Sequence, residues 1–252
     1  MNFEKFLRPI KASGTLNYIG IDHPDYWEYH WKQILKKYPN AFHDDTKEQI
    51  NYKLNAHGYR CKEFDNINWN NFVLFLGCSN TFGQGVPENY LASSLLEKHL
   101  NIDCVNLGVP GGSNILISDI ALHLVERKVL PKLVVVGWTT HNRIYDIVNN
   151  QIENLGIWST SWYSSKINLC KDFYKQWMLN DERTVYQSKL AQRQIRHYFK
   201  DVKILEYTYQ NDIAVTMNCM YIDNDKNSRA RDGYHESYKY HEEIYNWVIK
   251  NV

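Results

Sequence analysis

Short apolar runs alternate with helical patterns through the middle of the chain, and this alternation most constrains the fold. The runs are FVLFLG (72–77), DCVNLG (103–108) and KLVVVGW (132–138), and helical patterns at 87–100 and 113–128 follow the first two. Unbroken apolar strands are typical of parallel sheets that helices cover on both faces. The order therefore predicts an α/β fold of three α/β/α layers, built from βα units.

Further elements extend this pattern towards both ends of the chain. A long helix is predicted at 181–201, a fourth strand at 202–207 and a closing helix at 237–252. Near the N-terminus, HPDYWEYHWKQILKKYP (23–39) predicts an amphipathic helix. The segment 149–175 is polar and aromatic without a clear period, which predicts a long insertion over one face.

A chain of 252 residues and 30.0 kDa can form one large α/β domain with a proper core. We expect residues 51–252 to form this domain, with the insertion at 149–175. Residues 1–50 are expected to be an N-terminal extension or cap. The predicted elements do not say what that cap does.

The composition excludes several classes of partner. With 29 basic and 28 acidic residues and no long basic block, nucleic acid is not an expected partner. No apolar run reaches the roughly 18 residues of a membrane span, and charges interrupt every apolar run of the N-terminus, so we expect a cytoplasmic protein without a secretory signal. Five scattered cysteines indicate free thiols, and neither they nor the histidines have metal-ligand spacing, so no metal or organic cofactor is expected.

Residues that could take part in catalysis or binding gather where the predicted strands end. The three loops read GCSNTFG (77–83), NLGVPGGSN (106–114) and GWTTHNR (137–143). Just before the closing helix, Asp232 stands three residues ahead of His235. Because functional groups of parallel sheets collect at the carboxyl ends of strands, these segments are expected to meet.

Together these residues predict a nucleophilic apparatus. Ser79 would attack a carbonyl, His235 would take its proton, and Asp232 would orient the imidazole. Glycine-rich backbone would bring N–H donors close to a developing oxyanion. The simpler interpretation makes Ser79 an ordinary turn residue and the Asp232 segment a turn before a helix.

Four segments resemble the sequence blocks of the SGNH (GDSL-type) hydrolase superfamily, in the usual order. FLGCSNTFGQGV is similar to the first block, which implies that Ser79 is the nucleophile and an oxyanion donor. VNLGVPGGSN is similar to the second, which implies an oxyanion donor at Gly111. DGYHESYKYHEEIYNWV is similar to the last, which implies triad roles for Asp232 and His235. The resemblance covers roughly residue 50 to the C-terminus and includes Asn55, Gly58 and Arg60 of an upstream segment; it implies a flavodoxin-like, mainly parallel five-stranded sheet.

This chain departs from the family pattern at two positions. Cys78 stands where the first block usually has Asp, and Thr139 stands where the third block has an oxyanion-binding Asn. Thr139 can donate through its hydroxyl, with Thr140 or Asn142 as possible substitutes. The oxyanion hole is therefore the part that the resemblance supports least.

Substrate contacts are expected from Asn80, Trp138 and His141, although His141 fits a polar loop residue equally well. The resemblance implies a serine esterase or acylhydrolase that acts on a small-molecule or glycan ester, with O-acetyl carbohydrate as the first substrate class. Two alternatives stay open: acyl transfer to a sugar hydroxyl, and a non-catalytic binding or assembly module on the same fold. A phosphate-binding role for GVPGGS lacks the dinucleotide pattern. The oligomeric state is left open.

Overall fold

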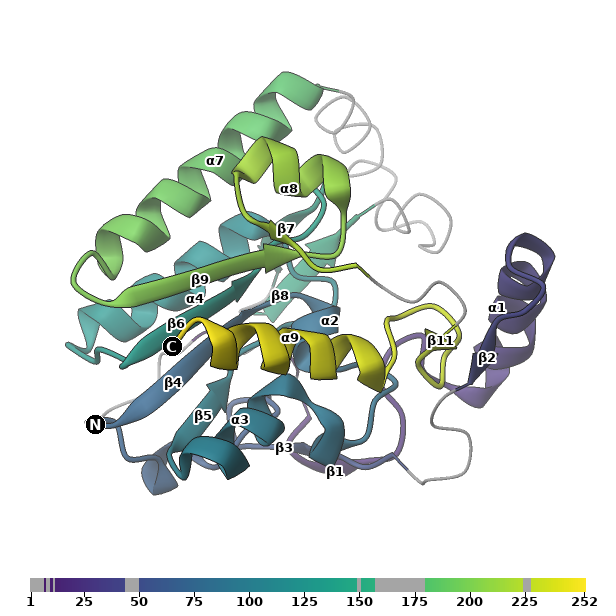
Figure 1. The fold of residues 1–252 in the computed structure, drawn as a ribbon, viewed down its shortest axis with the longest axis horizontal. Coiled ribbons are helices and arrows are strands. Elements are labelled where there is room, and N and C mark those ends of the chain that lie inside the picture. The colour runs from purple at the N-terminus through teal and green to yellow at the C-terminus, as the bar shows by residue number, and fades with distance from the viewer. Residues whose placement is uncertain are drawn as a thin grey trace.

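A central parallel sheet of five strands organises the chain (Figure 1). This computed structural model describes residues 12–43, 50–148, 151–156, 180–223 and 228–252, together with Leu7 and Ile10. The strand order is β10 (Met220–Tyr221), β9 (Lys203–Thr208), β6 (Leu133–Gly137), β4 (Phe72–Gly77) and β5 (Asp103–Asn106), and every neighbouring pair is parallel. Numbered by chain order within the sheet, this is 2-1-3-4-5, the flavodoxin-like order. The predicted fold class is confirmed.

Helices cover both faces of the sheet, because successive strand side chains point to opposite sides. Leu74 and Leu76 of β4 face the core shared with α4 (Asn114–Glu126) and α7 (Asp181–Tyr198). Val73 and Phe75 face the core shared with α3 (Ala92–Leu100) and α9 (Tyr238–Lys250). The short helix α8 (Asn211–Met217) contacts α7. The three predicted layers are present.

The predicted helix at 87–100 begins later than its sequence pattern indicates. Glu88–Tyr90 form a 3-10 turn, and the extended backbone of Leu91 separates this turn from α3. A similar 3-10 turn, Phe64–Asn66, precedes β4. Ser113 caps α4, since its hydroxyl accepts the N–H of Leu116 at 3.2 Å.

The N-terminal segment is joined to the rest of the fold by two small sheets. The strand β1 (Gly14–Leu16) pairs antiparallel with β3 (Tyr52–Leu54), and β2 (Phe42–His43) pairs parallel with β11 (Ser228–Arg229). Between β1 and β2 lies α1 (Pro24–Lys37), which begins with Pro at its first position. Figure 1 shows α1 beside β2 and β11, beyond the edge where the central strands end. The segment 1–50 therefore approaches that edge.

A hairpin of β7 (Ile144–Val148) and β8 (Gln151–Leu155) stands at the beginning of the predicted insertion. Residues 157–179, which hold most of that insertion, lie outside the described residues. Four of the five cysteines are described, and all four are free thiols. In the described ranges, no helix is both long and apolar enough to cross a membrane.

Candidate active site

A buried Asp–His pair stands in the turn before α9. Asp232 is fully buried, and its Oδ2 lies 2.5 Å from Nδ1 of His235. Its Oδ1 accepts the backbone N–H groups of Tyr234 at 2.8 Å and His235 at 2.9 Å. Gly233 has a φ of 69°, and a Cβ there would lie 2.9 Å from the Trp31 ring, so the turn requires glycine. The predicted pairing of Asp232 with His235 is present in the structure.

The two members of this pair shift each other's pKa. Burial would lower the pKa of His235, but the neighbouring Asp232 carboxylate raises it above the ordinary value. Burial would raise the pKa of Asp232, but His235 and the backbone N–H donors lower it below the ordinary value. Asp232 is therefore ionised at neutral pH and favours the Nδ1–H tautomer of a neutral His235, which leaves Nε2 able to accept a proton.

Ser79 lies at the carboxyl end of β4, as the first residue of the short helix α2 (Ser79–Phe82). The turn into α2 is tight, because a Cβ on Gly77 would lie 1.9 Å from Thr81 Oγ1. Only 5% of Ser79 is exposed. Both Ser79 and His235 are described, and no hydrogen bond joins the Ser79 hydroxyl to the His235 ring in this state. Such bonds are often long or poorly aligned in substrate-free enzymes and tighten when substrate binds.

Cys78 brings a thiol next to the same histidine. Burial would raise the pKa of Cys78, but Arg143, the N–H of Asn80, the Thr139 hydroxyl and His235 together lower it. Cys78 is 2% exposed, and a thiolate at this position favours the raised pKa of His235. Two nucleophilic side chains, Cys78 and Ser79, therefore stand side by side at the end of β4.

Thr139 follows β6, the strand next to β4. Gly77 pairs with Gly137 in the parallel register, so Ser79 and Thr139 each follow a paired strand end by two residues. Both backbone groups of Thr139 are engaged: its N–H donates to Asn114 Oδ1 and its carbonyl accepts from Asn114 Nδ2, each at 3.0 Å. Its hydroxyl is buried and lies beside the Cys78 thiol and the Tyr209 hydroxyl, and its hydrogen bonding favours a lower pKa for both groups. The hydroxyl is thus the donor that Thr139 can offer to an oxyanion.

Gly111 lies in the loop between β5 and α4 with a φ of 73°. Its N–H makes no hydrogen bond to any described residue, and the residue is partly exposed. The same loop is fastened to α2, since Asn106 Nδ2 donates to the Thr81 carbonyl at 2.8 Å and Gly108 packs against the Phe82 backbone. A free backbone donor is therefore held at the strand edge that Ser79 occupies.

The residues expected to contact substrate differ in burial and in their hydrogen-bond partners. Trp138 is 1% exposed, belongs to the core and donates from Nε1 to Glu206 at 3.0 Å, so it faces away from any ligand. His141 is half-buried, both of its ring nitrogens lack a hydrogen-bond partner among the described residues, and burial lowers its pKa. Asn80 lies in α2, and its buried Oδ1 likewise has no partner in the described part of the chain. Asn142 is partly exposed in the loop after β6.

Sequence reasoning missed the residues of the N-terminal segment that hold the Asp232 turn. Asp22, fully buried, binds the Arg231 guanidinium at 2.6 and 2.9 Å. Trp31 of α1 donates to the Arg231 carbonyl at 3.3 Å, and the His30 ring lies 5.7 Å from the Tyr234 ring. No local pattern marks these residues, because their partners lie about 200 positions away in the chain.

The fold and the site define a flavodoxin-like α/β protein with an Asp–His pair at the carboxyl edge of its sheet. No protein-family model matches this sequence, and a search of curated proteins found no match. Among solved structures, the fold is similar to an acetyl xylan esterase from the rumen bacterium Butyrivibrio proteoclasticus, at 10% sequence identity and a TM-score of 0.45 over 72% of this chain and 63% of that one.

Two other solved structures are similar to this chain at a comparably low sequence identity. A family two carbohydrate esterase from Clostridium thermocellum, in complex with cellohexaose, has 10% identity and a TM-score of 0.46, with 72% of this chain and 63% of that one covered. An SGNH-hydrolase family esterase has 15% identity and a TM-score of 0.33, with 72% and 71% covered. This chain spans about 63% of the length of the first two structures.

Proposed function

We propose that this protein is a serine ester hydrolase in which Ser79 is the nucleophile. The observation that carries the proposal is the buried pair of Asp232 and His235, joined at 2.5 Å, at the edge of the sheet where Ser79 begins α2 just after β4. Such a pair prepares a neutral imidazole to accept a proton and stabilises the imidazolium that results. The resemblance of the four sequence blocks to SGNH hydrolases supports the same roles.

In the proposed mechanism, Ser79 Oγ attacks the ester carbonyl carbon while its proton moves to His235 Nε2. The carbonyl oxygen becomes an oxyanion, which the N–H groups of Ser79 and Gly111 and the hydroxyl of Thr139 would stabilise. The tetrahedral intermediate collapses, the bond to the leaving oxygen breaks, and His235 returns its proton to the alcohol. Water then attacks the acyl-enzyme with His235 as base, and the free acid leaves.

The substrate class that we propose first is an O-acyl, and in particular an O-acetyl, carbohydrate. This choice comes from the resemblance to SGNH hydrolases. Product analysis separates hydrolysis from acyl transfer, since water as acceptor releases free acetate and a sugar hydroxyl as acceptor gives an acetylated glycan.

The test measures hydrolysis of p-nitrophenyl acetate and labelling by a fluorophosphonate probe. Wild type is compared with Ser79→Ala, His235→Ala and Cys78→Ala. We expect Ser79→Ala to abolish labelling and His235→Ala to lower kcat by about 10³- to 10⁶-fold. Cys78→Ala is the matched control for the adjacent nucleophile and should still be labelled. Turnover that survives in Ser79→Ala but is lost in Cys78→Ala would assign the thiol instead.

A second candidate is a non-catalytic binding module on the same fold. Two observations favour it: the Thr139 N–H is occupied by Asn114, and no hydrogen bond joins Ser79 to His235 in this state. Absence of both labelling and Ser79-dependent turnover in the folded wild type would support this candidate.

A further inference from the structure

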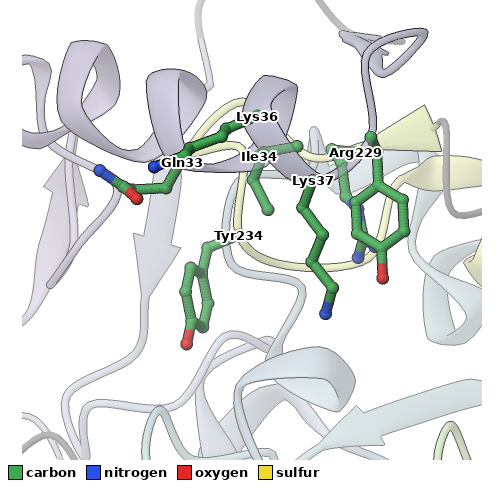
Figure 2. Close-up of a pocket in the computed structure, with 7 residues that line it drawn as sticks. Gln33, Ile34, Lys36, Lys37, Arg229 and Tyr234 are labelled. Atoms are coloured by element: carbon green, nitrogen blue, oxygen red, sulfur yellow. The ribbon is translucent and has the colours of Figure 1, made fainter.

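A basic pocket lies between α1 and the segment that carries the Asp232 turn. Its volume is about 610 Å³, and its lining comprises Gln33, Ile34, Lys36, Lys37, Tyr38, Arg229 and Tyr234. Figure 2 shows Lys37 and Tyr234 extending to the same side of α1. Among these lining residues there are three cationic side chains and no carboxylate. A pocket of this kind favours an anion.

Arg229 distinguishes this pocket from an ordinary lysine-bearing surface. Arg229 is only 7% exposed, and its Nη1 contacts both carboxylate oxygens of Glu236 at 3.2 Å. Its Nε is buried and has no hydrogen-bond partner among the described residues. A guanidinium has five N–H donors in a planar fork that suits oxyacid groups, so Arg229 retains unused donors here.

The charges of the pocket do not cancel. Glu236 neutralises Arg229, but Lys36 and Lys37 add two positive charges, whereas the whole chain has a formal net charge of +1. Lysines near a helix C-terminus also stabilise the helix dipole. That effect accounts for the lysines of α1 alone, and it does not account for a buried guanidinium from β11 in the same pocket.

The pocket shares a wall with the proposed active site. Tyr234 lines the pocket, and its N–H binds Asp232. On α1, His30, Ile34 and Lys37 recur at helical spacing on one face, and His30 lies against the Tyr234 ring. At 1.5 Å per residue, Lys37 is about 10 Å along the helix from His30. The Tyr234 segment therefore joins the pocket to the turn that holds Asp232.

We infer that this pocket binds an anionic group of the ester substrate, a carboxylate or a sulfate or phosphate ester. The inference rests on the proposed function, which it narrows to acyl esters of acidic carbohydrates. Lys37 and Lys36 attract the anion, the spare donors of Arg229 hold it, and the acyl group extends along Tyr234 towards His235. A neutral glycan leaves these donors unused.

The kinetic test compares three acetylated substrates: methyl glucoside, methyl glucuronide and methyl glucoside 6-sulfate. We expect kcat/KM to be higher for the two anionic esters, and the pair of anionic substrates tells carboxylate from sulfate. In Lys37→Gln the ratio of anionic to neutral kcat/KM should fall about tenfold, equivalent to about 1.4 kcal/mol. Lys32→Gln removes the same charge from the exposed face of α1, where Lys32 pairs with Glu28, and should keep the wild-type ratio.

The binding test does not need catalysis. Glucuronate and inorganic sulfate are titrated into Ser79→Ala, with and without Lys37→Gln, by calorimetry. Saturable binding that weakens in Lys37→Gln supports the pocket, even if no ester is cleaved and the proposed function fails. Equal turnover of neutral and anionic esters, with no saturable binding, overturns the pocket while leaving the ester hydrolase intact.

Discussion

At the scale of single residues, the Asp232–His235 pair predicts the pH dependence of ester hydrolysis. In the proposed mechanism, His235 must be neutral to accept the Ser79 proton. Asp232 raises the pKa of His235 above the ordinary value of 6.5 despite the opposing effect of burial. Activity is therefore present above the raised pKa and lost as pH falls through it. We expect the acid limb of kcat/KM, measured between about pH 5 and 9, to have its midpoint above 6.5.

Asp232→Asn tests the cause of this shift. Without the carboxylate, the pKa of His235 should fall, so the acid limb moves to lower pH while kcat drops by about 10⁴-fold. An unchanged acid limb in Asp232→Asn would mean that another group titrates. Circular dichroism serves as the control for folding, because Asn keeps the size of the buried side chain.

The Thr139 hydroxyl predicts a large effect on activity with a small effect on stability. Its neighbours are the weakly hydrogen-bonding Cys78 thiol and the Tyr209 hydroxyl, so Thr139→Val should change the free energy of unfolding by no more than about 1 kcal/mol. The same change removes the proposed oxyanion donor and should lower kcat by about 10²-fold. Urea unfolding and steady-state kinetics measure the two effects. Full activity in Thr139→Val would remove the residue from the oxyanion hole.

At the scale of elements, Asn114 joins the start of α4 to the loop after β6. Its amide binds the N–H and carbonyl of Thr139 and donates to Ser188 Oγ, each at 3.0 Å. Asn114→Ala leaves these buried groups unsatisfied and should lower the free energy of unfolding by about 2 kcal/mol. Because the Thr139 loop also loses its anchor, kcat should fall together with stability, unlike in Thr139→Val. Urea unfolding and steady-state kinetics of the two variants, run in parallel, check this difference.

A matched variant separates the anchor from a general loss of packing. Ser118 lies on the same helix, and its hydroxyl binds Gln194 of α7 at 3.0 Å, away from the site. Ser118→Ala should also lower stability but leave kcat unchanged. If both variants reduce kcat equally, Asn114 does not act through the Thr139 loop.

The elements that the sequence predicted are those whose pattern is local. The apolar runs at 72–77, 132–138 and 202–207 correspond to β4, β6 and β9 within a residue or two, because burial on both faces demands an unbroken apolar run. The two- and three-residue strands β1, β2, β3, β10 and β11 were not predicted. These strands are defined by pairing with other segments of the chain, and a strand of two or three residues is too short to show a hydrophobic period.

The same distinction between local patterns and long-range contacts applies to the residues of the site. Ser79, Asp232 and His235 lie in short motifs beside strong secondary-structure signals, and the Asp232–His235 pair is present as predicted. The bond of Asn114 with Thr139 spans 25 positions, and the ion pair of Asp22 with Arg231 spans 209. Such contacts follow from the assembled topology, and a motif does not encode them.

At the scale of the whole molecule, the N-terminal segment supports the turn that presents His235. Arg231 sits between Asp22 and the Gly85 carbonyl, which its N–H binds at 3.0 Å, and its guanidinium lies over the rings of Tyr18 and Trp27. Asp22 also accepts hydrogen bonds from Tyr52 and Trp27. The first 50 residues thus contribute to the site by fixing the loop next to Asp232, in addition to lining the basic pocket.

This arrangement predicts that breaking one ion pair in the N-terminal segment disturbs both stability and catalysis. Arg231→Met leaves the buried Asp22 carboxylate without its cation and should lower the free energy of unfolding by about 3 kcal/mol. Lys32→Met breaks the exposed pair with Glu28 and should cost less than about 1 kcal/mol. The double variant Asp22→Asn with Arg231→Met should recover part of the loss, because no unpaired buried charge remains. Urea unfolding of the wild type and these three variants, with kcat measured at saturating substrate, tests this.

Since the Arg231 carbonyl and N–H hold the turn that carries Asp232, kcat should fall in Arg231→Met and stay at the wild-type value in Lys32→Met. Loss of stability without any loss of kcat would mean that the N-terminal segment stabilises the fold but does not position the catalytic histidine.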